Sequence, residues 1–226
     1  YKKVSLAKVN PTVDLPDGAR EEFETVTHVL ITHCRYGHLD HLDSAGVGLI
    51  REKRLPVFCP VTDVKYLTKK GLDAHGIRPG DEQPFLDGGT IRTVACRHGR
   101  GMFGKLMDLC RGVGYFIRLP GEPGLYISGD TVLTGQVASF IRQNQPDIMV
   151  LPGGCAQSFA GGPILFTPEE LRQIVRMSKG TAVINHLDAL DHCRVSRIDL
   201  RTRFSNELGN GRMVIPEDGQ TVEMPL

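Results

Sequence analysis

Histidine and aspartate side chains gather in one short stretch of the chain, between residues 30 and 43. It holds two imidazoles and a carboxylate within four residues: His38, Asp40 and His41. Neutral imidazole and carboxylate are the usual ligands of a catalytic zinc or similar divalent ion, whereas structural sites are richer in cysteine. The stretch therefore indicates a catalytic metal site. The alternative is a polar loop that caps the following helix.

Four further candidate ligands follow segments that we expect to be strands. They are His33 after residues 26–32, His98 after 90–97, Asp130 after 125–128 and His186 after 181–184. Side chains at the ends of several strands of one sheet can meet in one place although they are far apart in sequence. We therefore expect all seven residues to converge on one or two metal ions.

The elements that position these residues alternate along the chain. Expected strands cover 26–32, 56–59, 90–97, 113–119, 125–128, 148–151, 181–184 and 212–215, and expected helices cover 43–53, 61–72, 132–142, 167–179 and 196–208. The helix at residue 167 has the clearest start, because Thr167, Pro168 and Glu170 form a capping box with proline in the first helical position. Alternation of this kind predicts a layered α/β fold with helices over a mixed sheet.

Composition and charge argue against nucleic-acid and membrane partners. The 226 residues carry 27 Lys and Arg against 26 Asp and Glu, a formal net charge of +1, so the sequence predicts no clustered basic face. No run approaches the roughly 18 apolar residues of a membrane-spanning helix. Six cysteines are scattered without a Cys-x-x-Cys pair, and we expect them to be reduced, as in the cytoplasm.

The order of the motifs resembles the metallo-β-lactamase superfamily. Thr32-His33, followed by His38-Leu39-Asp40-His41, is similar to its His-x-His-x-Asp-His signature, and Gly129-Asp130-Thr131 looks like the element that carries its bridging aspartate. The resemblance covers roughly residues 26–190. Softer matches at 152–154, 161–164 and 186–193 are similar to the branch that contains L-ascorbate 6-phosphate lactonase. The resemblance implies a single domain over residues 1–226, an αββα sandwich of two mixed β-sheets flanked by helices.

The resemblance also implies how the ligands divide between two ions. His38 and His98 would join the first metal site, and Asp40, His41 and His186 would form the second. Asp130 would bridge the two ions. Asp40 would be the catalytic residue, either through its bond to the metal or by also accepting a proton in the attack and returning it to the leaving group.

Two features depart from the superfamily pattern. At strict spacing the first histidine of the signature falls on Tyr36. Either this ligand is lost, or residues 35–37 are an insertion and His33 keeps the role. We favour His33, which leaves Tyr36 as a substrate contact or a supporting residue. Only 32 residues precede His33, so we expect the first strands of the superfamily sheet to be missing or supplied by another segment.

Other polar residues lie close to the candidate ligands. His192 is expected to line the site or to donate to a supporting carboxylate such as Asp188. Cys34 and Cys193 are also near ligands, but a free cysteine is usually a small buried hydrophobe, and this is our expectation for both. His75 precedes a glycine and is expected at a helix end.

The resemblance implies a hydrolase that uses metal-bound hydroxide on an ester, a lactone or a related bond of a small molecule. The expected cofactor is one or two zinc ions, with manganese as an alternative. Two other hypotheses stay open: a phosphodiesterase or nuclease on the same scaffold, and a metal-binding module without catalysis. We expect a cytoplasmic protein without nucleic-acid or membrane partners, and leave its oligomeric state open.

Overall fold

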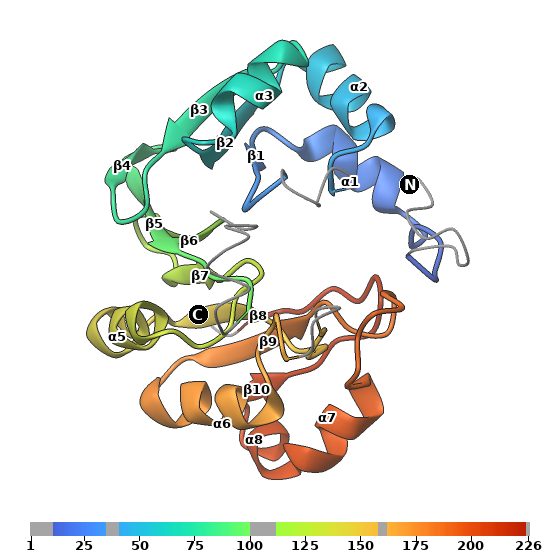
Figure 1. The fold of residues 1–226 in the computed structure, drawn as a ribbon, viewed down its shortest axis with the longest axis vertical. Helices are drawn as coiled ribbons and strands as arrows, with labels where there is room; N and C mark the ends of the chain where they lie inside the picture. The colour runs from blue at the N-terminus through green and yellow to red at the C-terminus, as the bar shows by residue number, and fades with distance from the viewer. Residues whose placement is uncertain (1–10, 35–40, 100–111, 158–161, 225–226) are drawn as a thin grey trace.

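The computed structural model describes residues 11–34, 41–99, 112–157 and 162–224, which form two β-sheets between layers of helices (Figure 1). The smaller sheet has the order β1-β2-β3, and its described strands are parallel. The larger sheet is mixed and has the order β10-β9-β8-β7-β6-β5-β4. The strands are β1 Val29–Leu30, β2 Pro56–Pro60, β3 Asp73–Ile77, β4 Glu82–Phe85, β5 Gly89–Ala95, β6 Val113–Arg118, β7 Leu125–Ile127, β8 Ile148–Pro152, β9 Thr181–Asn185 and β10 Met213–Val214.

The helices flank both sheets. They are α1 Ala19–Thr25, α2 Ser44–Glu52, α3 Val64–Lys69, α5 Gly135–Asn144, α6 Pro168–Met177, α7 Arg197–Arg203 and α8 Ser205–Gly209. In Figure 1, α2 and α3 lie outside the smaller sheet, while α6, α7 and α8 lie outside the larger one. This arrangement confirms the αββα fold. Within the described residues, no helix is both long and apolar enough to cross a membrane.

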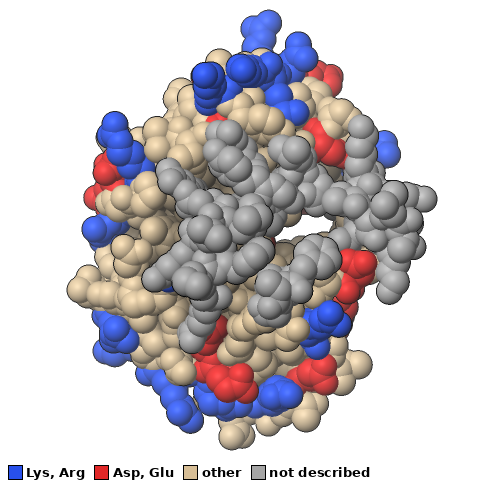
Figure 2. Space-filling view, in the orientation of Figure 1, with Lys and Arg blue, Asp and Glu red and all other residues tan. Residues whose placement is uncertain are grey.

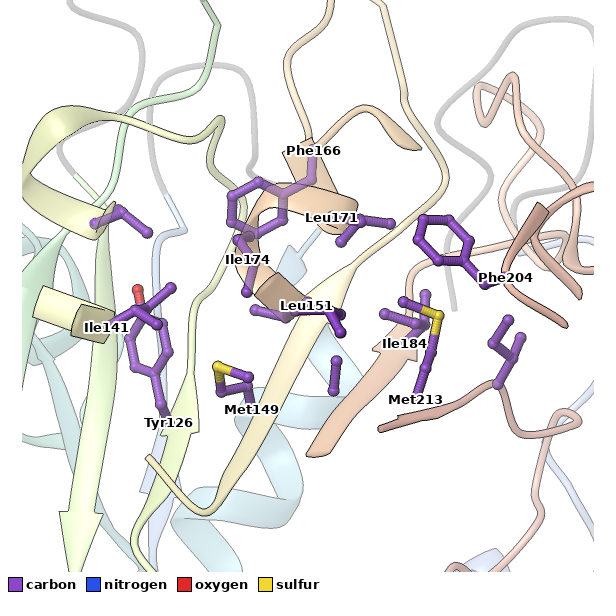
Figure 3. Close-up of a cluster of buried hydrophobic side chains, with 14 of the residues drawn as sticks. Tyr126, Ile141, Met149, Leu151, Phe166, Leu171, Ile174, Ile184, Phe204 and Met213 are labelled. Carbon is purple, nitrogen blue, oxygen red and sulfur yellow. The ribbon is translucent and has the colours of Figure 1, made fainter. Parts of the chain in front are cut away.

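The main core lies between the strands β7 to β10 and the helices α5 and α6 (Figure 3). The side chains of Leu171 and Ile174 on α6 are fully buried there. The predicted capping box begins this helix: Thr167 Oγ1 accepts from the Glu170 backbone N–H at 3.2 Å, and Glu170 accepts from the Thr167 backbone N–H at 3.0 Å. The cap fixes where α6 starts and therefore which of its faces meets the sheet.

The two sheets are joined through Tyr115 of β6. Its ring is fully buried in an apolar cluster that includes Ile77 and Ile91. Its hydroxyl donates toward two carbonyl oxygens of the smaller sheet region, Ile31 at 2.7 Å and Phe58 at 3.2 Å. The residues directly before His33 are therefore tied to both sheets.

Several elements differ from the sequence-based expectations. Strand β3 was not predicted, and His75 lies on it rather than at a helix end, stacked on Phe58 and 3.1 Å from the Asp73 carboxylate. Residues 196–208 form two helices, because buried Phe204 leaves the helical conformation between them. The helix predicted from residue 132 begins at Gly135, where the Thr134 hydroxyl caps it.

Two buried tyrosines give a matched test of the joint between the sheets. Tyr115→Phe removes a hydroxyl that serves two backbone carbonyls, so we expect the free energy of unfolding to fall by about 1–3 kcal/mol. Tyr126→Phe is the control, since its buried hydroxyl has no hydrogen-bond partner among the described residues and its removal should cost nothing or stabilise. Urea unfolding of both variants measures the difference. Equal losses would contradict the assigned role of Tyr115.

Candidate metal centre

Candidate ligands from both sheets meet at one edge of the larger sheet. Strands β5 and β7 are both antiparallel to β6 and so run the same way, and β8 and β9 are parallel to β7. The carboxyl ends of these strands therefore share an edge, as the sequence predicts. The residues that follow them are His98 after β5, Asp130 after β7 and His186 after β9, and they are joined by His33 after β1.

The carboxylate of Asp130 lies between two imidazoles. Its Oδ2 is 3.7 Å from His33 Nε2 and 3.6 Å from His186 Nε2. The His33 ring also lies near two other histidines, with ring centroids 5.8 Å from His98 and 4.8 Å from His41. Five of the predicted ligands are thus brought together, and Asp130 takes the central place among them.

The turn after β7 brings Asp130 close to the His33 segment. Gly129 has φ +62°, and a Cβ on it would lie 3.0 Å from Thr32 Cβ. Glycine is suited to this position because it adopts positive φ without strain and lets two backbones approach. The approach is completed by the backbone N–H of Val113, which donates to Thr32 O at 2.9 Å. The close approach of His33 and Asp130 therefore depends on the absence of a side chain at Gly129.

The segments that carry His98 and Asp130 are tied directly to each other. Thr131 Oγ1 accepts from the Arg97 backbone N–H at 2.9 Å, and the Val132 backbone N–H donates to Arg97 O at 3.0 Å. The Cys96 thiol donates to Ser128 O at 2.8 Å. These contacts on both sides of the two ligands limit their relative movement.

The Nδ1 atom of each of three histidines contacts a neighbouring group. His33 Nδ1 is 3.0 Å from Thr32 Oγ1, and His186 Nδ1 is 3.4 Å from the sulfur of Cys193. His98 Nδ1 is 3.0 Å from the carbonyl oxygen of Ile164. A carbonyl oxygen can only accept, so Nδ1 of His98 must carry the proton, and Nε2 of the neutral ring is then a lone-pair donor for a metal.

Burial shifts the pKa values of the ionisable side chains in the centre. Burial lowers the pKa of both His98 and His186, although the Asp130 carboxylate opposes the shift. Burial alone would raise the pKa of Asp130, but His186, His33 and His98 together hold that pKa below its usual value. The lowered pKa values of His98, His186 and Asp130 favour neutral imidazoles and an ionised carboxylate, the protonation states that metal ligation needs.

The donor set fits a divalent metal ion. His33, His98 and Asp130 each offer a ligand atom, and these atoms lie within 4.8 Å of one another. Ligands at about 2.0–2.2 Å from a shared ion lie somewhat closer than this, so small side-chain adjustments would suffice. Nitrogen and carboxylate oxygen are the donors of catalytic zinc sites, which agrees with the chemistry read from the sequence.

Other predicted site residues have different surroundings. Asp188 accepts from Arg197, at 2.9 Å from its backbone N–H and 3.1 Å from its guanidinium. The carboxylate beside His192 is that of Asp191, at 3.7 Å, rather than that of Asp188, and the His192 ring lies 5.2 Å from that of His186. His38, Asp40 and Tyr36 lie outside the described residues, so their roles stay predictions.

One buried carboxylate in the structure was not expected from the sequence. Asp63 is 3% exposed, and its Oδ2 accepts from the backbone N–H of Cys34 at 3.2 Å and from the Cys34 thiol at 3.4 Å. Asp63 therefore holds the backbone directly after His33. The sequence placed residue 63 inside an expected helix, where an aspartate is ordinarily solvated, so its type and position carried no signal of this contact.

The αββα fold and the cluster of histidines around Asp130 define a protein of the metallo-β-lactamase type. Residues 5–187 match the family model described as the beta-lactamase superfamily domain, so the chain belongs to this family.

Curated relatives include the UPF0173 protein YddR of Bacillus subtilis, 28% identical over 94% of this chain and 82% of that protein. Another is a UPF0173 metal-dependent hydrolase of Pelotomaculum thermopropionicum, 31% identical over 69% of this chain. The match spans 64% of the latter protein's length. The finer likeness to the L-ascorbate 6-phosphate lactonase branch stays a prediction.

Solved structures show the same fold. A possible metal-dependent hydrolase from Veillonella parvula superposes with a TM-score of 0.84 at 26% identity, over 96% of this chain and 83% of that one. An isothiocyanate hydrolase from Delia radicum gut bacteria also has a TM-score of 0.84, at 27% identity over 99% of this chain and 86% of that one.

Removing the Asp63 carboxylate tests its hold on the His33 segment. Asp63→Ala removes the buried carboxylate that accepts from the Cys34 N–H and thiol, so we expect the free energy of unfolding to fall by about 1–3 kcal/mol and zinc affinity to weaken. Asp81→Ala removes an exposed carboxylate and should change stability by less than about 0.5 kcal/mol. Urea unfolding and zinc titration measure both effects, and similar values for the two variants would refute the assignment.

Proposed function

We propose that this chain is a metal-dependent hydrolase that acts on an ester, a lactone or a related bond of a small molecule. The observation that carries the proposal is the Asp130 carboxylate, placed between Nε2 of His33 and Nε2 of His186 at the edge where parallel strands end. In α/β proteins this edge is where ligands bind. Family membership supports the same class of activity.

The proposed metal ligands are His33, His41, His98, Asp130 and His186, together with His38 and Asp40. A divalent ion, zinc or manganese, would supply an acidified water and a Lewis acid that polarises the scissile bond. The chain's own contribution is orientation. The contacts to Nδ1 of His33, His98 and His186 limit rotation of the rings, and Thr131 ties the Asp130 segment to the His98 segment.

Proton transfer is the second task of the chain. We propose Asp40 as the group that takes a proton from the attacking water and returns it to the leaving group. His192 is proposed as a residue at the rim of the site, because its half-exposed ring lies beside that of His186. Tyr36 is proposed as a substrate contact.

The likeness to the isothiocyanate hydrolase favours a second candidate substrate. An isothiocyanate, like an ester or a lactone, has an electrophilic carbon that water attacks, so the same arrangement of groups could serve each of them. A nuclease is less well supported. On the face shown in Figure 2, the Lys and Arg residues that the structure describes are scattered around the margin with Asp and Glu among them. Nucleic-acid grooves instead gather basic side chains on one surface.

Metal dependence is the first test of this proposal. We expect the purified protein to contain zinc or manganese by elemental analysis and to hydrolyse members of a panel of lactones, esters, isothiocyanates and phosphodiesters. Removal of the metal by a chelator should abolish turnover, and added zinc or manganese should restore it. A protein that stays metal-free when supplied with both ions would refute the proposal. Metal binding without turnover of any compound would instead support the non-catalytic module.

Substitution of single ligands is the second test. His98→Ala and Asp130→Ala should each lower turnover of the best substrate by at least about 100-fold, since even partners that only support ligands cost 10–100-fold. His75→Ala is the matched control, because His75 lies half-exposed on β3 and pairs with Asp73. Its turnover should equal that of the unmodified chain. Turnover that survives both ligand substitutions would place the reaction elsewhere.

A further inference from the structure

Cys193 contacts the His186 imidazole on the edge opposite Asp130. Nε2 of this ring is 3.6 Å from Asp130 Oδ2, whereas Nδ1 is 3.4 Å from the Cys193 sulfur. The two nitrogens of one proposed ligand therefore meet different partners. Whichever nitrogen carries the proton of the neutral ring, the other has the lone pair that can bind a metal.

The Cys193 sulfur also lies 3.3 Å from the backbone carbonyl oxygen of His186. That oxygen can only accept, and the single thiol hydrogen is donated either to it or to Nδ1 of the ring. When the hydrogen is donated to the carbonyl oxygen, the sulfur has no second hydrogen and can only accept from Nδ1. The arrangement that uses both contacts as hydrogen bonds has the proton of His186 on Nδ1, which leaves the lone pair on Nε2, facing Asp130.

Local packing holds Cys193 in this position. A Cβ at Gly154 would overlap both the Cys193 sulfur and the His186 carbonyl oxygen, so the Gly154 backbone lies directly against them. The backbone N–H groups of Arg194 and Val195 donate to Gly154 O at 2.8 and 3.1 Å. His186 itself has φ +54°, a conformation that is uncommon for a non-glycine residue and persists only when its surroundings fix it.

We propose that Cys193 is a positioning residue, whose sulfur and thiol hydrogen together hold His186 in the Nδ1–H tautomer and present Nε2 to the metal centre. The inference rests on the proposed metal-dependent function, because presenting Nε2 matters only if His186 binds a metal. The tautomer itself can be measured in the metal-free chain. His98 obtains the same orientation from the carbonyl of Ile164. A thiol thus performs at His186 the task that a backbone oxygen performs at His98.

A competing assignment would make Cys193 a metal ligand. His186, His192 and Cys193 offer ligand atoms within 4.8 Å of one another. Such a site would require the lone pair of His186 on Nδ1, and Nε2 would then carry the proton and could not bind an ion beside Asp130. The two assignments therefore exclude each other for the neutral ring, and one experiment separates them.

The tautomer of His186 is measurable without any metal. We expect two-dimensional ¹H–¹⁵N spectra of ¹⁵N-histidine-labelled, metal-free protein at about pH 8 to show His186 as the Nδ1–H tautomer, with the signals assigned from His186→Gln. Cys193→Ala should move these signals toward the Nε2–H form. Cys193→Ser should restore the Nδ1–H form, because a hydroxyl also donates once and accepts. Unchanged signals in Cys193→Ala would overturn the inference.

Metal binding gives the second readout. Cys193→Ala should weaken zinc affinity by about 10–100-fold in competition with a chromophoric chelator, as expected for the loss of a partner that orients a ligand. Cys193→Ser should recover part of this loss. Cobalt-substituted protein should show no thiolate-to-cobalt charge-transfer absorption that depends on Cys193. An absorption that disappears in Cys193→Ala would make the sulfur a ligand and overturn the inference.

Cys59→Ala is the matched control. The Cys59 thiol is buried and donates to a histidine carbonyl, that of His75 at 3.7 Å, but it lies on β2. In this variant, the signals of His186 and the zinc affinity should both equal those of the unmodified chain. If the unmodified chain binds no zinc or manganese, the proposed function fails, while the spectra of Cys193→Ala still decide the role of the cysteine.

Discussion

The buried carboxylate of Asp130 is the group on which the arrangement of the site depends. Burying an ionised carboxylate costs several kcal/mol unless opposite charge or hydrogen bonds compensate. The groups that face it are His33 and His186, which lower the pKa of Asp130 only while their rings carry positive charge, and burial lowers the pKa of His186. A divalent cation at this point would supply the missing charge. Metal binding and the stability of this edge of the sheet are therefore expected to be coupled.

Around Asp130, contacts to the backbone fix the positions of the proposed ligands. Gly129 lets the turn approach Thr32, Thr131 joins the neighbouring segment, and Ile164 orients His98. These contacts connect segments from different strands, so the centre is held by the sheet rather than by one flexible loop. Ligands supported in this way keep their geometry with little further ordering when a metal or substrate binds.

The sequence predicted the parts of the site that depend on regular elements. His98, Asp130 and His186 follow buried strands, and the order of strands in an α/β sheet brings such residues to one edge. Asp63 and Cys193 were missed because their contacts join residues far apart in sequence or depend on the positive φ of His186. Strand β3 was missed because its residues lack the alternating apolar pattern: only Ile77 is buried. Tertiary contacts, which no local pattern encodes, decided these positions.

The proposed ligands of the centre come from segments that extend from His33 to His186, on both sheets. Contacts between residues so distant in sequence form late, because the loops between them must first be closed at an entropic cost. We therefore do not expect the metal centre to nucleate folding as the metal of a zinc finger does. We expect instead that the apolar core around α6 assembles first and that the ion binds a nearly complete scaffold. For this chain, we therefore expect metal capture to be a late step of maturation rather than the first.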